Sequence, residues 1–110
     1  MNPVGPDNAI TGDTFHRTNG NRWFYTYVLM SEKDGKLYTG TTNDLNKRIN
    51  QHKNGLVSST KYRLPVLQVY FETCPTKEDA FRRERNLKTG MGKQYLKNRL
   101  NCSVNNLKER

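Results

Sequence analysis

Hydrophobic and polar residues follow one another in blocks that predict three strands. The stretch WFYTYVLM (Trp23–Met30) is aromatic and β-branched and apolar on both faces, which favours a strand in the middle of a sheet. The pair Asp34-Gly35 is a strong hairpin signal, so we expect residues 36–41 (KLYTGT) to form an antiparallel partner strand. A third apolar stretch predicts a strand over residues 66–72, with Pro65 at its start.

The segment TTNDLNKRINQHKNG (residues 41–55) has the pattern of a helix with marked ends. Thr42 or Asn43 can cap its first turn, Asp44 suits the positive end of the helix dipole, and Gly55 ends it. One face of this helix is expected to carry residues at helical spacing, with leucine and isoleucine buried and the polar pair at the border: Leu45, Arg48, Ile49 and His52.

A second helix is predicted after the third strand. TKED (residues 76–79) resembles a capping box with aspartate in its fourth place. The helix that follows is expected to bury Ala80, Phe81 and Leu87 and to turn Glu84 toward the same stripe. The glycines of TGMG (residues 89–92) predict a break, and residues 93–100 predict a last short helix.

The element order therefore predicts a small α+β domain, in which a three-stranded mixed or antiparallel sheet is flanked by helices in the order β-β-α-β-α-α. We expect this domain to span residues 23–100, with a flexible tail over residues 1–22 and a polar tail over residues 101–110. Walker, GxGxxG and GxSxG fingerprints are absent from the sequence.

Charge narrows the class of partner. Residues 1–35 hold three basic and four acidic side chains, whereas residues 36–110 hold sixteen basic and six acidic ones, within a formal net charge of +9. A compact domain with this excess attracts polyanions by counterion release. Nucleic acid is the first candidate, and an anionic membrane surface is the second.

Cysteine usage and hydropathy exclude other classes. Cys74 and Cys102 form no CxxC motif and no cluster with histidine, which argues against a structural zinc site, and we expect two buried free thiols. The sequence shows neither a secretion signal nor an apolar run long enough to span a bilayer, so we expect a cytoplasmic protein.

Several side chains are candidates for phosphodiester chemistry, and each has a structural alternative. Tyr27 and Tyr38 can approach one another across the hairpin, either as site hydroxyls or as ordinary cross-strand packing. Arg48 suits a phosphate or a solvated helix face, and His52 suits a proton shuttle or a helix C-terminus. Glu84 can bind a hard metal ion, or it can be neutralised by Arg82 or Arg85.

The order and spacing of these residues resemble the GIY-YIG nuclease superfamily. YTY (residues 25–27) stands where GIY is expected, and YTG (residues 38–40) stands for YIG. NDLNKRINQH (residues 43–52) matches the arginine helix, and RRERNLK (residues 82–88) matches the carboxylate helix. The resemblance covers about residues 23–100 and is greatest to small stand-alone bacterial members related to the N-terminal domain of the excinuclease C subunit.

The resemblance implies a metal-dependent endonuclease that cleaves DNA, with a function in DNA repair, and leaves a 5′-phosphate and a 3′-hydroxyl. It implies that Glu84 binds Mg²⁺ or Mn²⁺, that Tyr27 helps activate water, and that Tyr38 orients the water or the phosphate. It implies further that Arg48 holds the scissile phosphate, with His52 beside it. Nucleic-acid contacts are expected from basic side chains of the same region: Arg48, Lys47, Lys61 and Arg63.

Two departures from the family pattern bear on these expectations. Tyr25 stands where glycine is usual, and Thr41 stands where the excinuclease type has lysine. The family's late asparagine cannot be placed. The alternatives are a non-catalytic nucleic-acid-binding module on the same fold and a basic protein that binds an acidic partner.

Overall fold

Three strands, three α-helices and one short 3₁₀ helix make up the part of the chain that the computed structural model describes, residues 23–102. In chain order they are β1 (Phe24–Ser31), β2 (Leu37–Thr42), α1 (Leu45–Lys53), η2 (Lys61–Arg63), β3 (Val66–Cys74), α2 (Lys77–Leu87) and α3 (Gly90–Arg99). This order confirms the predicted α+β class. The tail expected over residues 1–22, and residues 103–110 of the other tail, lie outside the described residues.

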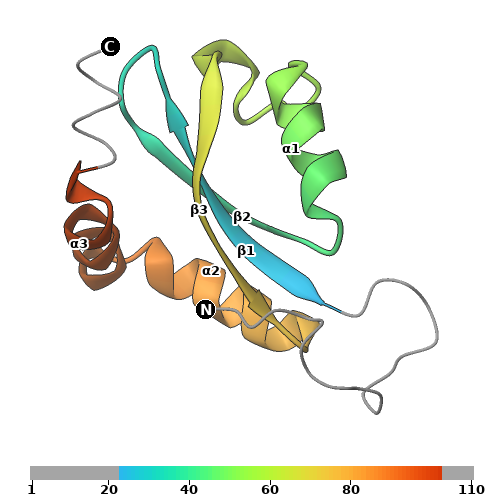
Figure 1. Cartoon of the computed structure of the whole chain (residues 1–110), viewed down its shortest axis with the longest axis vertical. Coiled ribbons are helices and arrows are strands. Elements are labelled where there is room, and N and C mark those ends of the chain that lie inside the picture. The colour runs from blue at the N-terminus through green and yellow to red at the C-terminus, as the bar shows by residue number, and fades with distance from the viewer. Residues whose placement is uncertain (1–22, 103–110) are drawn as a thin grey trace.

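The three strands form one antiparallel sheet in the order β2-β1-β3 (Figure 1). β1 is central, as its apolar residues on both faces predict, and β2 and β3 are the two edges. In the β1–β2 pairing Tyr27 lies opposite Gly40, and Leu29 lies opposite Tyr38. Tyr27 and Tyr38 are therefore diagonal neighbours on one face of the sheet.

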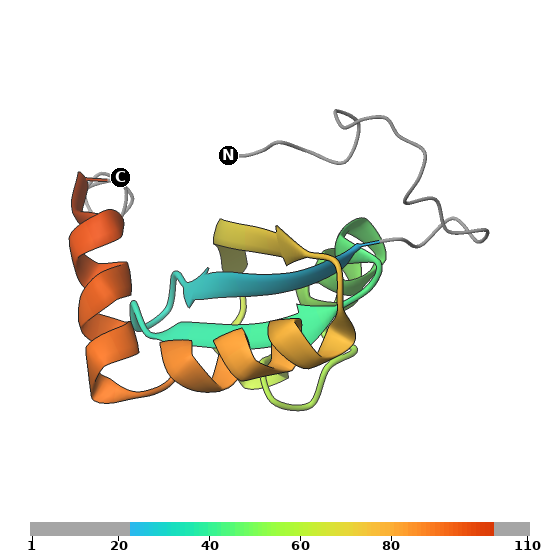
Figure 2. The same ribbon diagram turned by 90° about the horizontal axis from the view of Figure 1, so that it is seen from below.

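Helices cover both faces of the sheet, with α1 on one side and α2 and α3 on the other (Figure 1). Alternation along β1 divides the core in two: Tyr27 and Leu29 pack against the α1 side, and Val28 packs against the side of α2 and α3. α2 runs alongside the strands, and α3 stands across the end of the sheet at the β1–β2 turn (Figure 2).

The helix ends follow local hydrogen bonding. The α1 cap is Asp44, whose side chain accepts from the backbone N–H of Lys47, and not Thr42 or Asn43 as expected. Gly55 has a φ of 76° and follows the end of α1, as predicted. Thr76 caps α2 by accepting from the N–H of Asp79.

The break predicted at TGMG is present, because α2 ends at Leu87, but α3 begins at Gly90 with Thr89 as its cap and not at residue 93 as expected. Gly92 lies inside α3, where a Cβ atom would stand 2.0 Å from the carbonyl oxygen of Asn86 and 2.5 Å from the Cα of Leu87. Glycine at this position therefore serves close packing of α3 on the end of α2.

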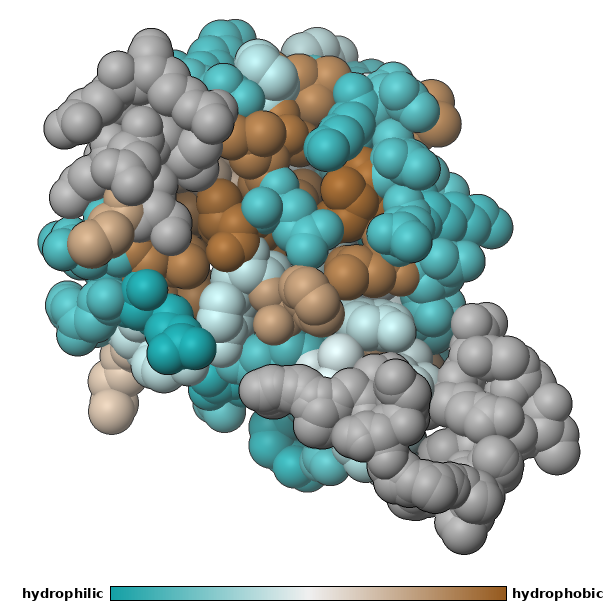
Figure 3. All heavy atoms as spheres, in the orientation of Figure 1, coloured by the Kyte–Doolittle hydropathy of each residue, from teal (hydrophilic) through white to brown (hydrophobic). Residues whose placement is uncertain are grey.

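Burial differs from expectation at three side chains. Phe81 was expected in the core but is 42 % exposed. Cys74 is half-buried and Cys102 is exposed, so the two free thiols are not core residues. In the view of Figure 3, apolar side chains gather over the strands in the middle of the molecule, with hydrophilic side chains on both sides.

Candidate functional site

The candidate site is built on β1 and β2, where the Tyr27 side chain crosses Gly40. A Cβ atom at Gly40 would stand 2.5 Å from the Tyr27 Oη and 2.6 Å from its Cζ. Only a residue without a side chain leaves room for the phenol at this crossing. Gly40 thereby lets a residue of the central strand bring its hydroxyl toward the edge strand.

The Tyr27 hydroxyl is the centre of a hydrogen-bonded cluster with two residues of α1. It lies 2.8 Å from His52 Nε2, and the Arg48 Nε–H donates to it at 3.4 Å. Arg48 also donates from Nη1 to Gln51 Oε1 at 3.1 Å. A guanidinium has five N–H groups, so donors beyond these two bonds remain for a phosphate.

His52 is fully buried and has protein partners on both ring nitrogens. Its Nδ1 lies 2.7 Å from Thr60 Oγ1, and its Nε2 is the atom bonded to Tyr27. This placement differs from the expected position beside the phosphate, because a ring enclosed in this way cannot touch substrate. His52 instead holds Tyr27.

Tyr38 completes the aromatic part of the site. Its ring centroid lies 6.4 Å from that of Tyr27 and 5.2 Å from that of His52. The expected approach of the two tyrosines across the hairpin is present, through the diagonal register of β1 and β2. Tyr38 is half-buried, so part of its side chain is accessible to a ligand.

Glu84 reaches the same edge of the sheet from α2. The Thr41 hydroxyl donates to its Oε1 at 2.5 Å, and the Lys88 ammonium contacts its Oε2 at 2.8 Å. The Glu84 side chain is 18 % exposed. Its charge is also the smallest of the influences that raise the pKa of Tyr27, after burial and the neighbouring Tyr38.

The environment shifts the pKa values of two members of this cluster. Burial, first of all, raises the pKa of Tyr27 above its usual value, and the Arg48 hydrogen bond opposes the rise. Burial, followed by the charge of Arg48, lowers the pKa of His52 to about 4. At neutral pH the imidazole is therefore uncharged, and one ring nitrogen donates while the other accepts.

Glu84 is suited to a hydrated divalent cation. Residues 23–102 contain no cluster of three or more histidine, cysteine, aspartate and glutamate side chains, so an ion at Glu84 would have at most two such side chains as ligands. Mg²⁺ commonly binds through one or two carboxylates, with waters and substrate phosphates completing its shell. Lys88 is 53 % exposed, so it can leave the carboxylate at small cost.

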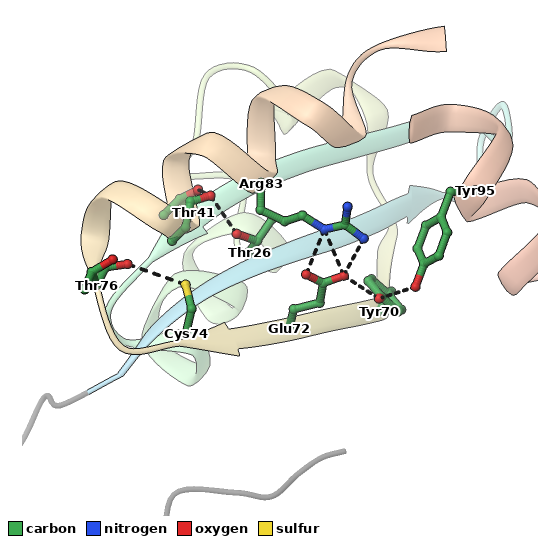
Figure 4. A network of polar contacts seen from close by, with 9 residues as sticks. Thr26, Thr41, Tyr70, Glu72, Cys74, Thr76, Arg83 and Tyr95 are labelled. Atoms are coloured by element: carbon green, nitrogen blue, oxygen red, sulfur yellow. Dashed lines mark hydrogen bonds and ion pairs between the residues drawn. The ribbon is translucent and has the colours of Figure 1, made fainter. Parts of the chain in front are cut away.

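The alternative expected for Glu84 was neutralisation by Arg82 or Arg85, whereas the structure pairs Glu84 with Lys88. Arg82 pairs with Asp79, and Arg83 forms a two-pronged ion pair with Glu72 of β3. Figure 4 shows the Arg83–Glu72 pair beside Tyr70 and Tyr95, away from Thr41. Neither arginine neutralises Glu84, and among residues 23–102 Arg85 forms no ion pair with it.

The basic side chains predicted to bind nucleic acid do not all lie at the cluster. Arg48 is part of it, and Arg63 lines a cavity that Tyr38 also lines. Lys47 is exposed on α1, and Lys61 is exposed on η2 with its ammonium 5.0 Å from the Tyr62 ring centroid. If Lys47 and Lys61 bind nucleic acid as predicted, the contact surface extends beyond the cluster around Tyr27.

Three further residues hold the site together and were not predicted from the sequence: Thr41, Thr60 and Lys88. The spacing of Glu84 and Lys88, four residues apart on a helix, is a signal that predicts their ion pair. Thr60 carries no such signal, because its link to His52 depends on the loop after α1.

The chain is similar in sequence to a known domain family and to several bacterial proteins. The GIY-YIG catalytic domain family matches residues 23–101. A UPF0213 protein of Staphylococcus saprophyticus is 45 % identical over 74 residues, which are 66 % of this chain and 89 % of that protein. A UPF0213 protein of Staphylococcus epidermidis is 48 % identical over 74 residues, which are again 66 % of this chain and 89 % of that protein.

A solved structure is also similar. The solution NMR structure of the UPF0213 protein BH0048 from Bacillus halodurans has 36 % sequence identity and a TM-score of 0.44, and it covers 67 % of this chain and 81 % of its own. No helix of residues 23–102 has both the length and the hydrophobicity to cross a membrane.

Proposed function

The chain belongs to the GIY-YIG family, a family of endonucleases that are generally metal-dependent, and on this premise we propose that it hydrolyses phosphodiester bonds in DNA with Mg²⁺ or Mn²⁺. The observation that supports the proposal is that Arg48 bonds to the Tyr27 hydroxyl on β1 while Glu84 bonds to Thr41 on β2, the strand paired with β1. Branched, nicked or single-stranded DNA is the proposed substrate.

Arg48 binds the scissile phosphate in this proposal. Its Nε is held by Tyr27 and its Nη1 by Gln51, so the guanidinium is oriented before substrate arrives. A planar fork fixed in this way matches the oxygens of a phosphate and stabilises the negative charge that develops on them. Tyr38, whose ring borders the cluster, orients the phosphate or the attacking water.

Tyr27 takes the proton of the attacking water. To do so its oxygen must carry negative charge, and burial opposes this by raising its pKa. Donation from Arg48 works in the opposite direction. A second donor on the same oxygen would help further, and His52 Nε2 is placed to be that donor.

Thr60 sets the form of His52 in which Nε2 carries the proton. The imidazole is neutral, so Nε2 donates only when Nδ1 accepts. The Thr60 hydroxyl, 2.7 Å from Nδ1, supplies the required donor. His52 and Thr60 are therefore positioning residues, and Tyr27 is the residue that touches the water.

Glu84 holds the divalent ion, which when bound supplies positive charge beside the phosphate. Thr41 fixes the carboxylate by donating to Oε1, and Lys88 neutralises Oε2 until the ion replaces it. As water attacks phosphorus and gives a proton to Tyr27, the bond from phosphorus to the 3′-oxygen breaks. The 3′-oxygen leaves with the electron pair of that bond and takes a proton from solvent, so the products are a 5′-phosphate and a 3′-hydroxyl.

Cleavage of plasmid and single-stranded DNA in Mg²⁺ or Mn²⁺ tests the proposed function. We expect Glu84→Gln to lower the rate by about 100-fold or more, because it removes the charge that binds the cation. Glu78→Gln, an exposed glutamate in the first turn of the same helix, is the matched control and should cleave at the wild-type rate. Chelation should abolish cleavage by both active proteins.

Equal cleavage by Glu84→Gln and the wild type would contradict the role of Glu84. DNA retardation that weakens with salt, without cleavage in either metal, would instead support a binding module that lacks activity.

A further inference from the structure

A second feature lies beside the candidate site, at the end of the sheet next to α3. A cavity of about 710 Å³ opens there between β2, the β1–β2 turn and the α2–α3 segment. Tyr38 and Lys88 line it, and these residues also contact the candidate site, through His52 and Glu84 respectively. Two of the residues that line the cavity are therefore direct neighbours of residues of the candidate site.

The cavity combines an apolar base with a positively charged rim. Its apolar surface comes from Leu37, Leu87 and Leu96, which belong to the core cluster on the α2 and α3 side of the sheet. Its rim carries five cationic side chains and no acidic one: Lys36, Arg63, Lys88, Lys93 and Lys97. Ligand pockets of about 300–1,000 Å³ are common in proteins, so this volume is large enough for a ligand of nucleotide size.

The charges of α3 are available to a ligand. Lys93 and Lys97 are exposed and stand one helical turn apart on α3. Neither forms an ion pair with a carboxylate among residues 23–102. Ammonium groups without an acidic partner are attracted to phosphate through counterion release.

This chemistry favours a strand whose bases are not paired. Proteins that bind single-stranded nucleic acid join a positive groove, which follows the backbone, to aromatic or apolar surfaces on which bases stack. In a duplex the bases are stacked on one another, so a base must be extruded from the helix before it can enter a pocket. An unpaired nucleotide presents its base without that cost.

We propose that this cavity binds unpaired nucleotides of the strand that continues from the scissile phosphate. The enzyme then acts where a duplex meets a single strand, or on a single strand itself. The inference rests on the proposed nuclease function for its biological use, whereas the binding that it predicts is measured without cleavage.

The double variant Lys93→Gln/Lys97→Gln tests the cavity, with Lys53→Gln/Lys77→Gln as the control of equal charge. Lys53 ends α1 and Lys77 begins α2, and neither lines the cavity. Fluorescence anisotropy in EDTA would measure affinity for one labelled strand presented as a single strand, as a flap, and as a blunt duplex, over a range of salt concentrations.

We expect the cavity variant to bind the single strand and the flap about tenfold more weakly than the control does, with the salt slope reduced by about 1.4 for two lost phosphate contacts. The blunt duplex should lose affinity equally in the two variants. With wild-type protein, photocrosslinking of a single strand that carries 5-iodouracil should label residues 36–39 or 93–97.

Three outcomes would overturn the proposal: equal binding of single strands by the two variants, a matching loss on the duplex, or competition by a free mononucleotide as strong as by the strand. Its fate is separate from that of the nuclease function. If the protein cleaves no DNA but the cavity variant binds single strands more weakly than the control, the inference about the cavity stands. If the protein cleaves DNA but the two variants bind single strands equally, only the nuclease function stands.

Discussion

At the scale of single residues, the chain from Thr60 through His52 to Tyr27 decides how the phenol is polarised. All three side chains are buried and joined by bonds of 2.7 and 2.8 Å. Because the low pKa keeps the imidazole neutral, the direction of one bond fixes the direction of the other. In the proposed mechanism, the Thr60 hydroxyl thereby controls, through His52, the hydrogen bonding of the Tyr27 oxygen that accepts the proton of water.

Thr60→Val should separate this effect from packing, since valine keeps the shape and removes the hydroxyl. We expect cleavage to fall by about tenfold and the protein to lose about 1–3 kcal/mol of stability, because Nδ1 is left without its partner. Nitrogen-15 NMR of His52 should show one form protonated at Nε2 in the wild type and a mixture in the variant.

Thr60→Ser keeps the hydroxyl and should restore both the single His52 form and most of the cleavage rate. A wild-type imidazole protonated at Nδ1, or a valine variant with unchanged activity and spectrum, would show that Thr60 does not act through His52.

At the scale of elements, the junction of α2 and α3 depends on a glycine that has no room for a side chain. The backbone of Asn86 and Leu87 occupies the space that a Cβ atom at Gly92 would need. Backbone cannot rotate away as the end of a flexible side chain can. The angle between the two helices is therefore set at this contact. Lys93 and Lys97 follow Gly92 on α3, so the same contact positions them at the cavity.

Gly92→Ala should consequently destabilise the domain by about 2 kcal/mol or more, as overpacking does. Gly90→Ala is the control in the same segment, since no atom lies within 4 Å of a Cβ added there. That change should be neutral or stabilise by up to about 1 kcal/mol. Urea denaturation of the two variants would measure the difference, and equal midpoints would contradict this account of the junction.

The sequence predicts those features that depend on local signals. β1 follows from its aromatic and β-branched residues, β2 from the hairpin signal at Asp34-Gly35, and the cap at Thr76 from its spacing to Asp79. The start of α3 was missed because glycines usually mark breaks, whereas here Gly92 answers to a neighbouring helix. That requirement is tertiary, so no local pattern carries it.

Site residues divide in the same way. Tyr27, Tyr38 and Glu84 were predicted through motif order; the structure places the rings of Tyr27 and Tyr38 6.4 Å apart and bonds Glu84 to Thr41 of β2. Burial of His52 was missed because a polar residue on the border of a helix face gives no sign of what the following loop places over it. Sequence spacing indicates which residues share a face, and only the fold decides which of them water can reach.

At the scale of the whole molecule, the buried imidazole links stability to pH. Folded protein keeps His52 neutral down to a pKa of about 4, whereas the unfolded chain protonates it near pH 6.5. Between these values the unfolded state binds more protons, so stability falls as pH falls. The contribution is fully present above pH 6.5.

We expect the free energy of unfolding, from urea titrations, to fall by about 2 kcal/mol between pH 7 and pH 5. NMR should show His52 still uncharged at pH 5. His52→Gln should flatten the dependence in this range, even if its stability at pH 7 is lower. Stability that is constant or increases between pH 7 and pH 5 would contradict the depressed pKa.

One arrangement reaches across the entire fold. Adjacent residues of α2 are tied to opposite strands of the sheet, with Glu84 bonded to Thr41 of β2 and Arg83 paired with Glu72 of β3. Rolling α2 about its own axis to free one of them would strain the other. The position of the Glu84 carboxylate above β2 thus depends on an ion pair at the opposite edge of the sheet, so a substitution at Glu72 would move Glu84 without touching it.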